Sequence, residues 1–161
     1  MAGSGAPEMG VKKVRGARIG VVASRWHDTV MDGLIDGASR AIKAAGAKGY
    51  LYRVPGSFEL PLGAAKALAR KDIDAVVALG VVIRGATPHF DYVCDAATQG
   101  LLRASLDAKK PVGFGLLTCD NEQQALDRAG VEDSCEDKGF EAAAAAIEMI
   151  ALEGKRLKLK R

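Results

Sequence analysis

Residues 75–83, AVVALGVVI, form an apolar run that is rich in valine and shows no alternation of polar and apolar positions. A run of this kind is typical of a strand that is covered on both faces. Three more short apolar runs, at 17–24, 49–54 and 111–118, alternate with longer amphipathic or alanine-rich stretches. This alternation predicts a parallel sheet of four strands with helices on both faces. We therefore expect a single three-layer α/β/α domain with flavodoxin-like winding.

Composition limits the classes of partner. The chain has 161 residues, of which 48% are hydrophobic and 27% charged, as is usual for a soluble globular domain. Its formal net charge of +3 is too small to indicate nucleic acid. The basic tail GKRLKLKR is interpreted as a solvated end. No apolar stretch approaches the roughly 18 residues that a membrane span needs. We expect neither nucleic acid nor a membrane as partner.

The predicted domain organisation is simple. Residues 1–13 are expected to form a flexible arm, because MAGSGAPEMG lacks the basic-then-apolar layout of a signal peptide. The folded domain is expected over 14–154, followed by the basic tail at 155–161. The cysteines form no CxxC pair and would leave one over if two were bridged: Cys94, Cys119 and Cys135. That pattern suits a reducing compartment, so we expect a cytoplasmic protein.

Ligands of such sheets bind at the carboxyl ends of the strands, so the residues after each apolar run are candidates. After the third run, Thr87 is expected to be an N-cap and Pro88 the first helical residue. A helix start preceded by Gly85 offers free N–H groups and the positive end of a dipole, which suits a phosphate. His89 in the first turn is the residue there that could move a proton near neutral pH. The alternative is a plain helix cap with a surface histidine.

The turn after the first run contains the chain's one tryptophan, Trp26. A tryptophan at this point could stack on a planar ligand, although it could equally lie in the core or in an interface. His27 and Asp28 are expected to start the next helix, with Asp28 as its cap. A catalytic role for His27 is the less favoured hypothesis.

The turn after the second run, VPGSFELP, places a Pro-Gly turn before Ser57, Phe58 and Glu59. Backbone amides freed by the turn, together with the Glu59 carboxylate, could bind the hydrogen-bonding edge of a polar heterocycle. The alternative is a capping turn in which Ser57 is the cap and Phe58 lies in the core.

Charged candidates follow the fourth run. Asn121 and Gln124 have the spacing of a capping box and predict a helix start. Arg128 is expected in the last turn of that helix, where it would either complement the helix dipole or clamp a phosphate with two hydrogen bonds. Lys138 is expected to open the final helix, where a cation opposes the dipole and so suggests a functional charge.

Two classes of site are excluded by motif. The glycines form neither GxGxxG nor GxxxxGK[ST], which argues against dinucleotide and P-loop binding. The spacing of cysteine, histidine and carboxylate residues gives no credible metal site. We therefore expect neither a metal nor an organic cofactor.

Five stretches together carry a family resemblance: ALGVVIRGATPHFDYV, VPGSFELP, GFGLLT, EQQALDRAG and DKG. They resemble 6,7-dimethyl-8-ribityllumazine synthase, the penultimate enzyme of riboflavin biosynthesis. The resemblance runs from about residue 18 to residue 150, and GxVIRGxTxHxDYV is highly specific. It implies condensation of 5-amino-6-(D-ribitylamino)uracil with 3,4-dihydroxy-2-butanone 4-phosphate, with release of phosphate and water and without a cofactor.

The resemblance also implies roles for individual positions. His89 matches the proton-transferring histidine, and Arg128 matches the arginine that clamps the phosphate. The phosphate-binding turn corresponds to Gly85, Ala86 and Thr87. Trp26 matches the aromatic residue that stacks on the pyrimidine. The other implied substrate contacts are Ser57, Phe58, Glu59, Val81, Val82, Ile83, Phe114 and Lys138, with Phe114 expected from a neighbouring subunit.

The family assembles as pentamers, and some members pack twelve pentamers into a shell. The connector VEDSCEDKG, at 131–139, is longer than the corresponding loop of shell-forming members, so we expect a free homopentamer. In the family, the segment that corresponds to residues 11–16 pairs with a neighbour's sheet, which implies active sites between subunits. Many members have asparagine directly after the stacking aromatic residue, where this chain has His27 followed by Asp28.

Two other functions are alternatives. The archaeal type of riboflavin synthase resembles this family and would dismutate the lumazine. A flavin- or lumazine-binding oligomer without turnover is the non-enzymatic alternative. His89 and Arg128 argue against it, because a pure binder has no need of a proton shuttle.

Overall fold

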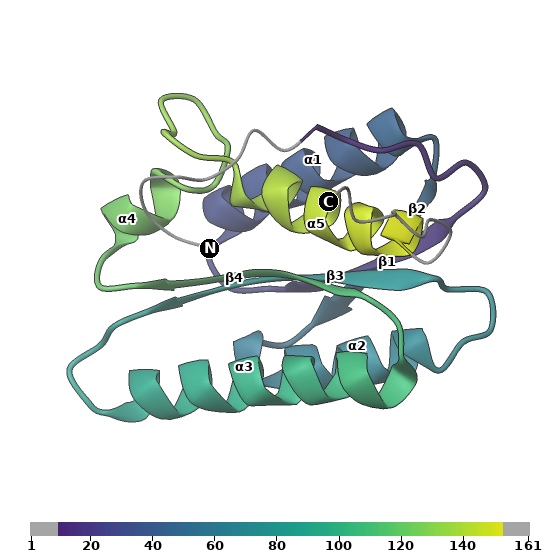
Figure 1. The fold of residues 1–161 in the computed structure, drawn as a ribbon. Helices are drawn as coiled ribbons and strands as arrows, with labels where there is room; N and C mark the ends of the chain where they lie inside the picture. Colours follow the sequence, from purple (N-terminus) through teal and green to yellow (C-terminus); the bar gives the residue numbers. More distant parts are fainter. Residues whose placement is uncertain (1–9, 153–161) are drawn as a thin grey trace, which may run out of the picture.

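The structure is a computed structural model and describes residues 10–152. It contains one four-stranded sheet, with all strands parallel, in the order β2-β1-β3-β4 (Figure 1). The strands are β1 (Arg18–Ser24), β2 (Lys48–Val54), β3 (Ala75–Ile83) and β4 (Val112–Cys119). The predicted fold class and its four strands are confirmed. The predicted tail at 155–161, and most of the predicted arm at 1–13, lie outside the described residues.

Helices cover both faces of the sheet (Figure 1). One face carries α1 (Asp28–Ala45) and α5 (Lys138–Leu152), and the other carries α2 (Leu60–Leu68) and α3 (His89–Ala108). The apolar side chains form two clusters, one between the sheet and each helical layer. The first seven residues of β3 are buried, as expected for a strand covered on both faces. The valine-rich run therefore marks the centre of a three-layer domain.

Small residues bring α1 and α5 close together. A Cβ atom added to Gly139 would lie 2.1 Å from the backbone oxygen of Leu34, and one added to Gly33 would lie 2.5 Å from the oxygen of Ala129. Both distances are far below van der Waals contact, so these glycines are required by packing. The contact of Gly33 with Ala129 places the connector that leads into α5 directly against α1.

The starts of two helices differ from the predictions. Pro88 is the N-cap of α3, and no side chain provides a capping hydrogen bond, so the prediction of Thr87 as cap was wrong. His27 is the N-cap of α1, because its carbonyl accepts the first helical hydrogen bond from Met31, at 2.9 Å. Asp28 is the first helical residue, and its prediction as cap was also wrong. Both starts are displaced by one residue from the prediction, which is an ordinary uncertainty of helix ends.

The capping prediction for α4 (Glu122–Leu126) is confirmed. The Gln124 amide donates to Asn121 Oδ1 at 3.0 Å, and the Asp120 amide donates to Gln124 Oε1 at 2.8 Å. These two bonds satisfy backbone donors at the helix start. Because α4 ends at Leu126, Arg128 lies beyond the helix and not in its last turn, which corrects that prediction.

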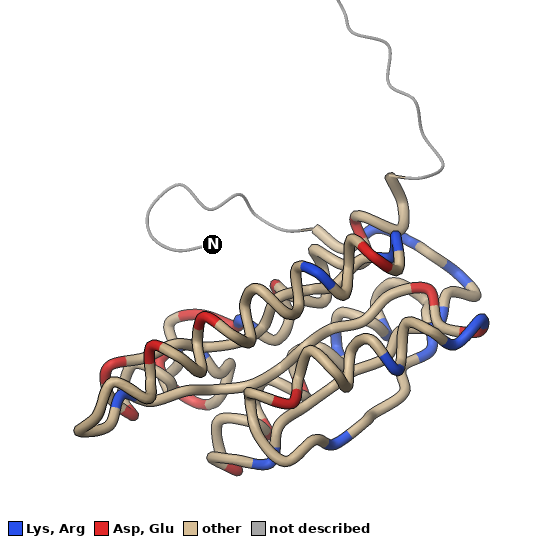
Figure 2. The backbone as a smooth tube through the Cα atoms, turned by 90° about the horizontal axis from the view of Figure 1, so that it is seen from below, with Lys and Arg blue, Asp and Glu red and all other residues tan. Residues whose placement is uncertain are grey.

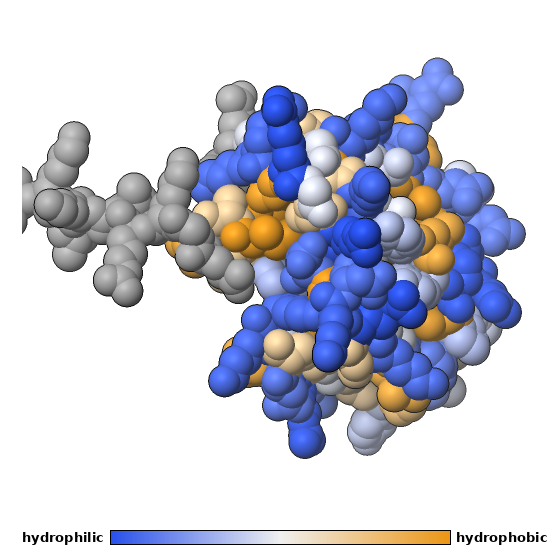
Figure 3. Space-filling model, turned by 90° about the vertical axis from the view of Figure 1, so that its right-hand side faces the viewer, coloured by the Kyte–Doolittle hydropathy of each residue, from blue (hydrophilic) through white to orange (hydrophobic). Residues whose placement is uncertain are grey.

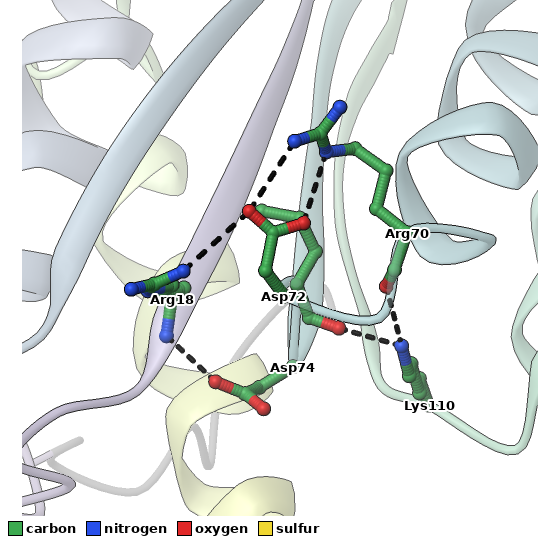
Figure 4. A network of polar contacts seen from close by, with 6 residues as sticks. Arg18, Arg70, Asp72, Asp74 and Lys110 are labelled. Carbon is green, nitrogen blue, oxygen red and sulfur yellow. Dashed lines mark hydrogen bonds and ion pairs between the residues drawn. The ribbon is translucent and has the colours of Figure 1, made fainter.

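A polar network ties the elements together at the amino ends of the strands (Figure 4). The Arg18 amide donates to Asp74 at 2.7 Å, and the guanidinium groups of Arg18 and Arg70 both pair with Asp72. The Lys110 ammonium group donates to three backbone carbonyls at the end of α2 and in the turn before β3, those of Leu68, Arg70 and Ile73, at 3.0, 3.0 and 2.6 Å. This end of the molecule is covered mostly by hydrophilic side chains (Figure 3).

Candidate active site at the carboxyl ends of the strands

A cavity of about 310 Å³ opens where β1, β2 and β3 end. Its walls come from four segments that are distant in sequence: the turn after β1, the turn after β2, the end of β3 and the first turns of α3. The lining residues are Trp26, His27, Gly56, Ser57, Phe58, Glu59, Val81, Val82, Ile83, His89 and Val93. Eight of these are sequence-predicted site residues, so the fold brings most of the predicted substrate contacts into one pocket.

The two aromatic rings of the pocket face outward. Trp26 is 65% exposed and Phe58 is 60% exposed, although both are large apolar side chains. Neither ring is therefore a core residue of this chain, which excludes the core alternative for both. A Cβ atom at Gly56 would lie 3.4 Å from Trp26 Nε1, so the tryptophan lies directly against the turn that carries Phe58. An exposed pair of this kind at a cavity mouth suits a planar ligand.

Ser57 supports the floor of the pocket. It is buried, and its hydroxyl donates to the backbone carbonyl of Val81 at 3.1 Å. It does not cap the short 3₁₀ helix η1 (Ser57–Glu59), whose N-cap is Gly56. A Cβ atom at Gly80 would lie 2.9 Å from Ser57 Oγ, so the glycine in β3 makes room for this contact. The turn after β2 is thereby fixed to the end of β3.

The loop between β3 and α3 offers unpaired backbone donors. Within residues 10–152, the amides of Gly85, Ala86 and Thr87 donate no hydrogen bond. The φ angle of Gly85 lies outside the left-handed region, and a Cβ atom there would meet no atom within 4 Å. Neither backbone strain nor packing within the chain explains the glycine. A ligand that approaches the backbone closely would explain it.

Both histidines of the chain line this pocket. His89 is the first residue of α3 and is exposed, so its imidazole is available to a ligand. His27 has a φ angle of 60°, in the left-handed region that non-glycine residues adopt rarely and that favours asparagine, aspartate and histidine. The backbone therefore accounts for the type of residue found after Trp26.

Arg128 lies outside the cavity lining. Its Nη1 atom donates to the backbone carbonyl of Gln124 at 2.9 Å, and its Nε atom lies 3.9 Å from Glu136 Oε1. The contact with a carbonyl of α4 agrees with the alternative in which Arg128 complements a helix end. The Lys138 amide donates to the Arg128 carbonyl at 3.0 Å, so the backbone holds these two cations close together.

Phe114 and Lys138 line a second cavity of about 300 Å³, between β4, α5 and the end of α3. Phe114 is 47% exposed although it belongs to a strand. Lys138 pairs with Glu136 and Glu141. Burial disfavours its charged form, but the hydrogen bonds to these two carboxylates outweigh burial and raise the pKa of Lys138. The predicted site residues that line a cavity therefore fall into two groups within the chain.

Val93 was missed by the sequence analysis. It lies four residues after His89 on α3, and residues at that spacing share one face of a helix. That spacing was the sequence signal that could have identified Val93.

Among the described residues, no cluster of three or more histidine, cysteine and carboxylate side chains could hold a metal ion. No helix in the described part of the chain is both long and apolar enough to cross a membrane.

The fold and cavity together define a class. In the order β2-β1-β3-β4 the winding reverses between β1 and β3, and the cavity opens beside the carboxyl ends of these two strands. This is the position at which doubly wound parallel sheets bind small ligands. The protein is thus a flavodoxin-like α/β/α protein with a small-molecule site.

Comparison with known proteins identifies the family. Residues 16–154 match the family model described as 6,7-dimethyl-8-ribityllumazine synthase. The chain is 62% identical over 148 residues to the 6,7-dimethyl-8-ribityllumazine synthase of Streptomyces coelicolor, covering 91% of each chain. It is 59% identical over 156 residues to that of Kineococcus radiotolerans, covering 96% of each chain. The chain belongs to the 6,7-dimethyl-8-ribityllumazine synthase family, whose members are transferases.

Proposed function

We propose that this chain condenses 5-amino-6-(D-ribitylamino)uracil with 3,4-dihydroxy-2-butanone 4-phosphate to 6,7-dimethyl-8-ribityllumazine, phosphate and water, in riboflavin biosynthesis. The family membership supports this activity. The observation that carries the site assignment is the pocket that gathers seven predicted substrate contacts together with His89. The family match also disfavours the archaeal type of riboflavin synthase as an alternative.

The pyrimidine substrate occupies the pocket beside β2 and β3. The exposed rings of Trp26 and Phe58 offer apolar surface to its planar ring. The Glu59 carboxylate and the backbone near Ser57 provide hydrogen-bonding partners for the polar edge of the ring and for the ribityl chain. Val81, Val82 and Ile83 add apolar surface to the lining of the same pocket.

The phosphate substrate binds at the loop before α3. The unpaired amides of Gly85, Ala86 and Thr87 and the positive end of the α3 dipole face its phosphate, and Arg128 clamps it. The 5-amino group attacks the ketone carbonyl, and loss of one water molecule gives a Schiff base. The carbon next to the imine then loses a proton, the C–O bond to phosphate breaks, and phosphate leaves with the electron pair. The resulting enol takes up a proton to become a ketone, which the ribitylamino nitrogen attacks, and ring closure releases a second water molecule. His89 moves protons in these steps.

Orientation of the two reactants supplies much of the acceleration. Each step is an ordinary carbonyl or elimination reaction, which explains why no metal or organic cofactor is required. A pocket that holds the amine and the ketone in contact converts a bimolecular encounter into an intramolecular reaction. The proton transfers by His89 then lower the remaining barriers.

The active site lies between subunits of a homopentamer. The separation of the pocket residues from the group formed by Phe114, Arg128 and Lys138 supports this arrangement. A neighbouring subunit contributes the second group, and the exposed ring of Phe114 closes the pocket. Strand β2 lies at an edge of the sheet, and no strand within residues 10–152 pairs with its outer side. Its Leu51 side chain is 53% exposed, so this edge offers surface to a neighbouring subunit.

In the structure, residues 11–16 lie against the chain's own helices. The Val14 amide donates to the Ala45 carbonyl at 3.0 Å, and Lys12 pairs with Glu148 of α5 at 2.5 Å. Pairing of this segment with a neighbour's sheet therefore requires these contacts to be exchanged on assembly.

The long connector at 131–139 favours free pentamers over a shell. The three free cysteines fit a cytoplasmic location.

Mixing the purified protein with both substrates tests the function. Fluorescent lumazine and one equivalent of inorganic phosphate are expected. Formation of riboflavin from lumazine alone would instead support the riboflavin synthase alternative. Tight flavin binding without turnover of either substrate would support the binding protein.

A further inference from the structure

Arg84, the residue directly after β3, lies at the centre of a compact charge cluster. Its Nε atom donates to Asp120 Oδ1 at 3.0 Å, and its Nη1 atom donates to Asp91 Oδ1 at 3.2 Å. Its Cζ atom lies 4.1 Å from the centroid of the Phe90 ring, which is close enough for a cation–π contact. The Arg84 amide also donates to the Cys119 carbonyl at 2.9 Å. One side chain thus contacts the first turn of α3 and the end of β4.

The charge of Arg84 is already satisfied within the chain. Two carboxylates accept its hydrogen bonds and an aromatic ring covers one face. The hydrogen bond that Arg84 donates to Asp120 stabilises the guanidinium, and although desolvation opposes this effect, the pKa of Arg84 is raised. One cation between two anions gives the cluster a net negative charge. Such a cluster is a poor direct site for a phosphate, in contrast to Arg128, whose single ion pair spans 3.9 Å.

The partners of Arg84 lie on both sides of the loop at residues 85–89, which binds the phosphate in the proposed function. Arg84 precedes the loop, and Phe90 and Asp91 follow it, so the guanidinium joins the two ends of residues 85–89. Within residues 10–152, the amides of the first three loop residues make no hydrogen bond of their own. The Arg84 side chain is therefore a principal restraint on the position of these amides and of His89.

The cluster is also connected to Arg128 by consecutive hydrogen bonds. Arg84 binds Asp120, the Asp120 amide donates to the Gln124 side chain, and Arg128 donates to the Gln124 carbonyl. The last two contacts are at 2.8 and 2.9 Å. A displacement of Asp120 therefore reaches the loop before α3 in this chain's own site. It also reaches the turn of Arg128, which in the proposed pentamer serves the site shared with a neighbouring subunit.

We infer that Arg84 is a positioning residue for the phosphate half of the active site, which it serves by bracing the 85–89 loop against Asp91, Phe90 and Asp120. This inference rests on the proposed function. It assigns Arg84 no contact with the substrate. Its contribution is to hold the free amides and His89 in the arrangement that the phosphate requires.

Steady-state kinetics of Arg84→Ala tests the inference. Because the contacts are exposed, we expect a moderate effect, about a 5-fold rise in KM for the butanone phosphate and in the Ki of inorganic phosphate. KM for the pyrimidine substrate should stay within about 2-fold, because its pocket is held by Ser57 and not by Arg84. Arg103→Ala is the matched control, since it removes another exposed arginine–aspartate pair from α3, and it should leave all constants unchanged.

Asp120→Asn separates positioning from direct binding. It keeps the shape of the side chain and removes one carboxylate charge from Arg84. Positioning predicts weaker binding of inorganic phosphate, whereas direct binding by Arg84 predicts tighter binding because the cation is released. Unchanged phosphate constants in an active, folded Arg84→Ala enzyme, or tighter binding in Asp120→Asn, would overturn the inference alone. A wild-type protein that fails to convert the substrates refutes the proposed function and the inference with it.

Discussion

The two ends of the sheet differ in how completely their polar groups are satisfied. At the amino ends, the Lys110 ammonium group donates to three backbone carbonyls (Figure 4). Asp72 pairs with the side chains of Arg18 and Arg70, and Asp74 accepts a hydrogen bond from the Arg18 amide. At the carboxyl ends, aromatic rings are exposed and the Gly85–Thr87 amides have no partner within residues 10–152. The first end stabilises the fold, and the second keeps groups available for a ligand.

Charge also differs between the two ends. Acidic residues gather near the carboxyl ends of the strands, and basic residues gather near the amino ends (Figure 2). Pairing differs as well, because Lys110, Asp72 and Asp74 at the amino ends are bound by backbone and side-chain groups, whereas the loop before α3 depends on Arg84. Substitutions at the two ends should therefore have separable consequences, on stability at one end and on kinetics at the other.

His89→Ala should have the largest effect. Loss of the proton-transferring imidazole should lower kcat on the order of 100-fold, the lower limit for general acid–base catalysis, because orientation of the substrates is retained. The temperature of unfolding should not change, since His89 is exposed. Stopped-flow or steady-state lumazine formation measures the effect, and undiminished turnover would exclude the proton-shuttle role.

Lys110→Ala should act at the opposite end. Removal of three charge-assisted hydrogen bonds to backbone carbonyls should lower the free energy of unfolding by about 2 kcal/mol. Both KM values and kcat should match wild type at temperatures where the variant is folded. Lys66→Ala, at an exposed position of α2, is the control and should unfold as wild type does. A changed kcat or KM in folded Lys110→Ala would contradict the claim that the amino ends of the strands contribute to stability and not to catalysis.

Arg128→Ala should raise KM for the butanone phosphate on the order of 10-fold, because a charge-assisted contact with the phosphate is lost. The KM for the pyrimidine should change much less, since Arg128 does not line the pyrimidine pocket of the chain. Initial rates with each substrate varied in turn separate the two constants. The clamp would be contradicted by an unaltered KM for the phosphate substrate.

Gly85→Ala should have the smallest effect. A Cβ atom there has no neighbour in the chain, so stability should be unchanged, while a ligand on the backbone should bind about 3-fold more weakly. Gly46→Ala is the opposite case, because Gly46 has a φ angle of 71° at the end of α1. It should lower the free energy of unfolding by about 1 kcal/mol and leave both KM values unchanged. If Gly85→Ala and Gly46→Ala changed the free energy of unfolding and the KM values equally, the contrast between a ligand-binding glycine and a structural glycine would be contradicted.

Much of the fold was predictable because buried parallel strands have a distinctive pattern. The run Ala75–Ile83 is apolar throughout, and the structure places it inside the sheet. The pocket followed from the same prediction, since the carboxyl ends of neighbouring parallel strands must lie together. This is why Trp26, Ser57 and His89 could be assigned to one site from the sequence.

Other features depend on tertiary geometry that the sequence pattern does not encode. The helix starts were displaced by one residue at Thr87 and at Asp28, because a cap depends on the backbone angles of the preceding turn. The cluster of Arg84 with Asp91 and Asp120 joins residues up to 36 positions apart. No local spacing predicts such a contact, since it exists only once β3 and β4 are paired.

Complementation between two defective variants tests the central claim most directly, namely that the pocket is completed by Arg128 of a neighbouring subunit. His89→Ala and Arg128→Ala subunits are unfolded together, reassembled at equal amounts and assayed at a low concentration of the phosphate substrate. Random assembly should give roughly a quarter of the sites both wild-type residues, so about a quarter of wild-type activity should return. Activity no higher than the average of the two separate variants would contradict the shared site.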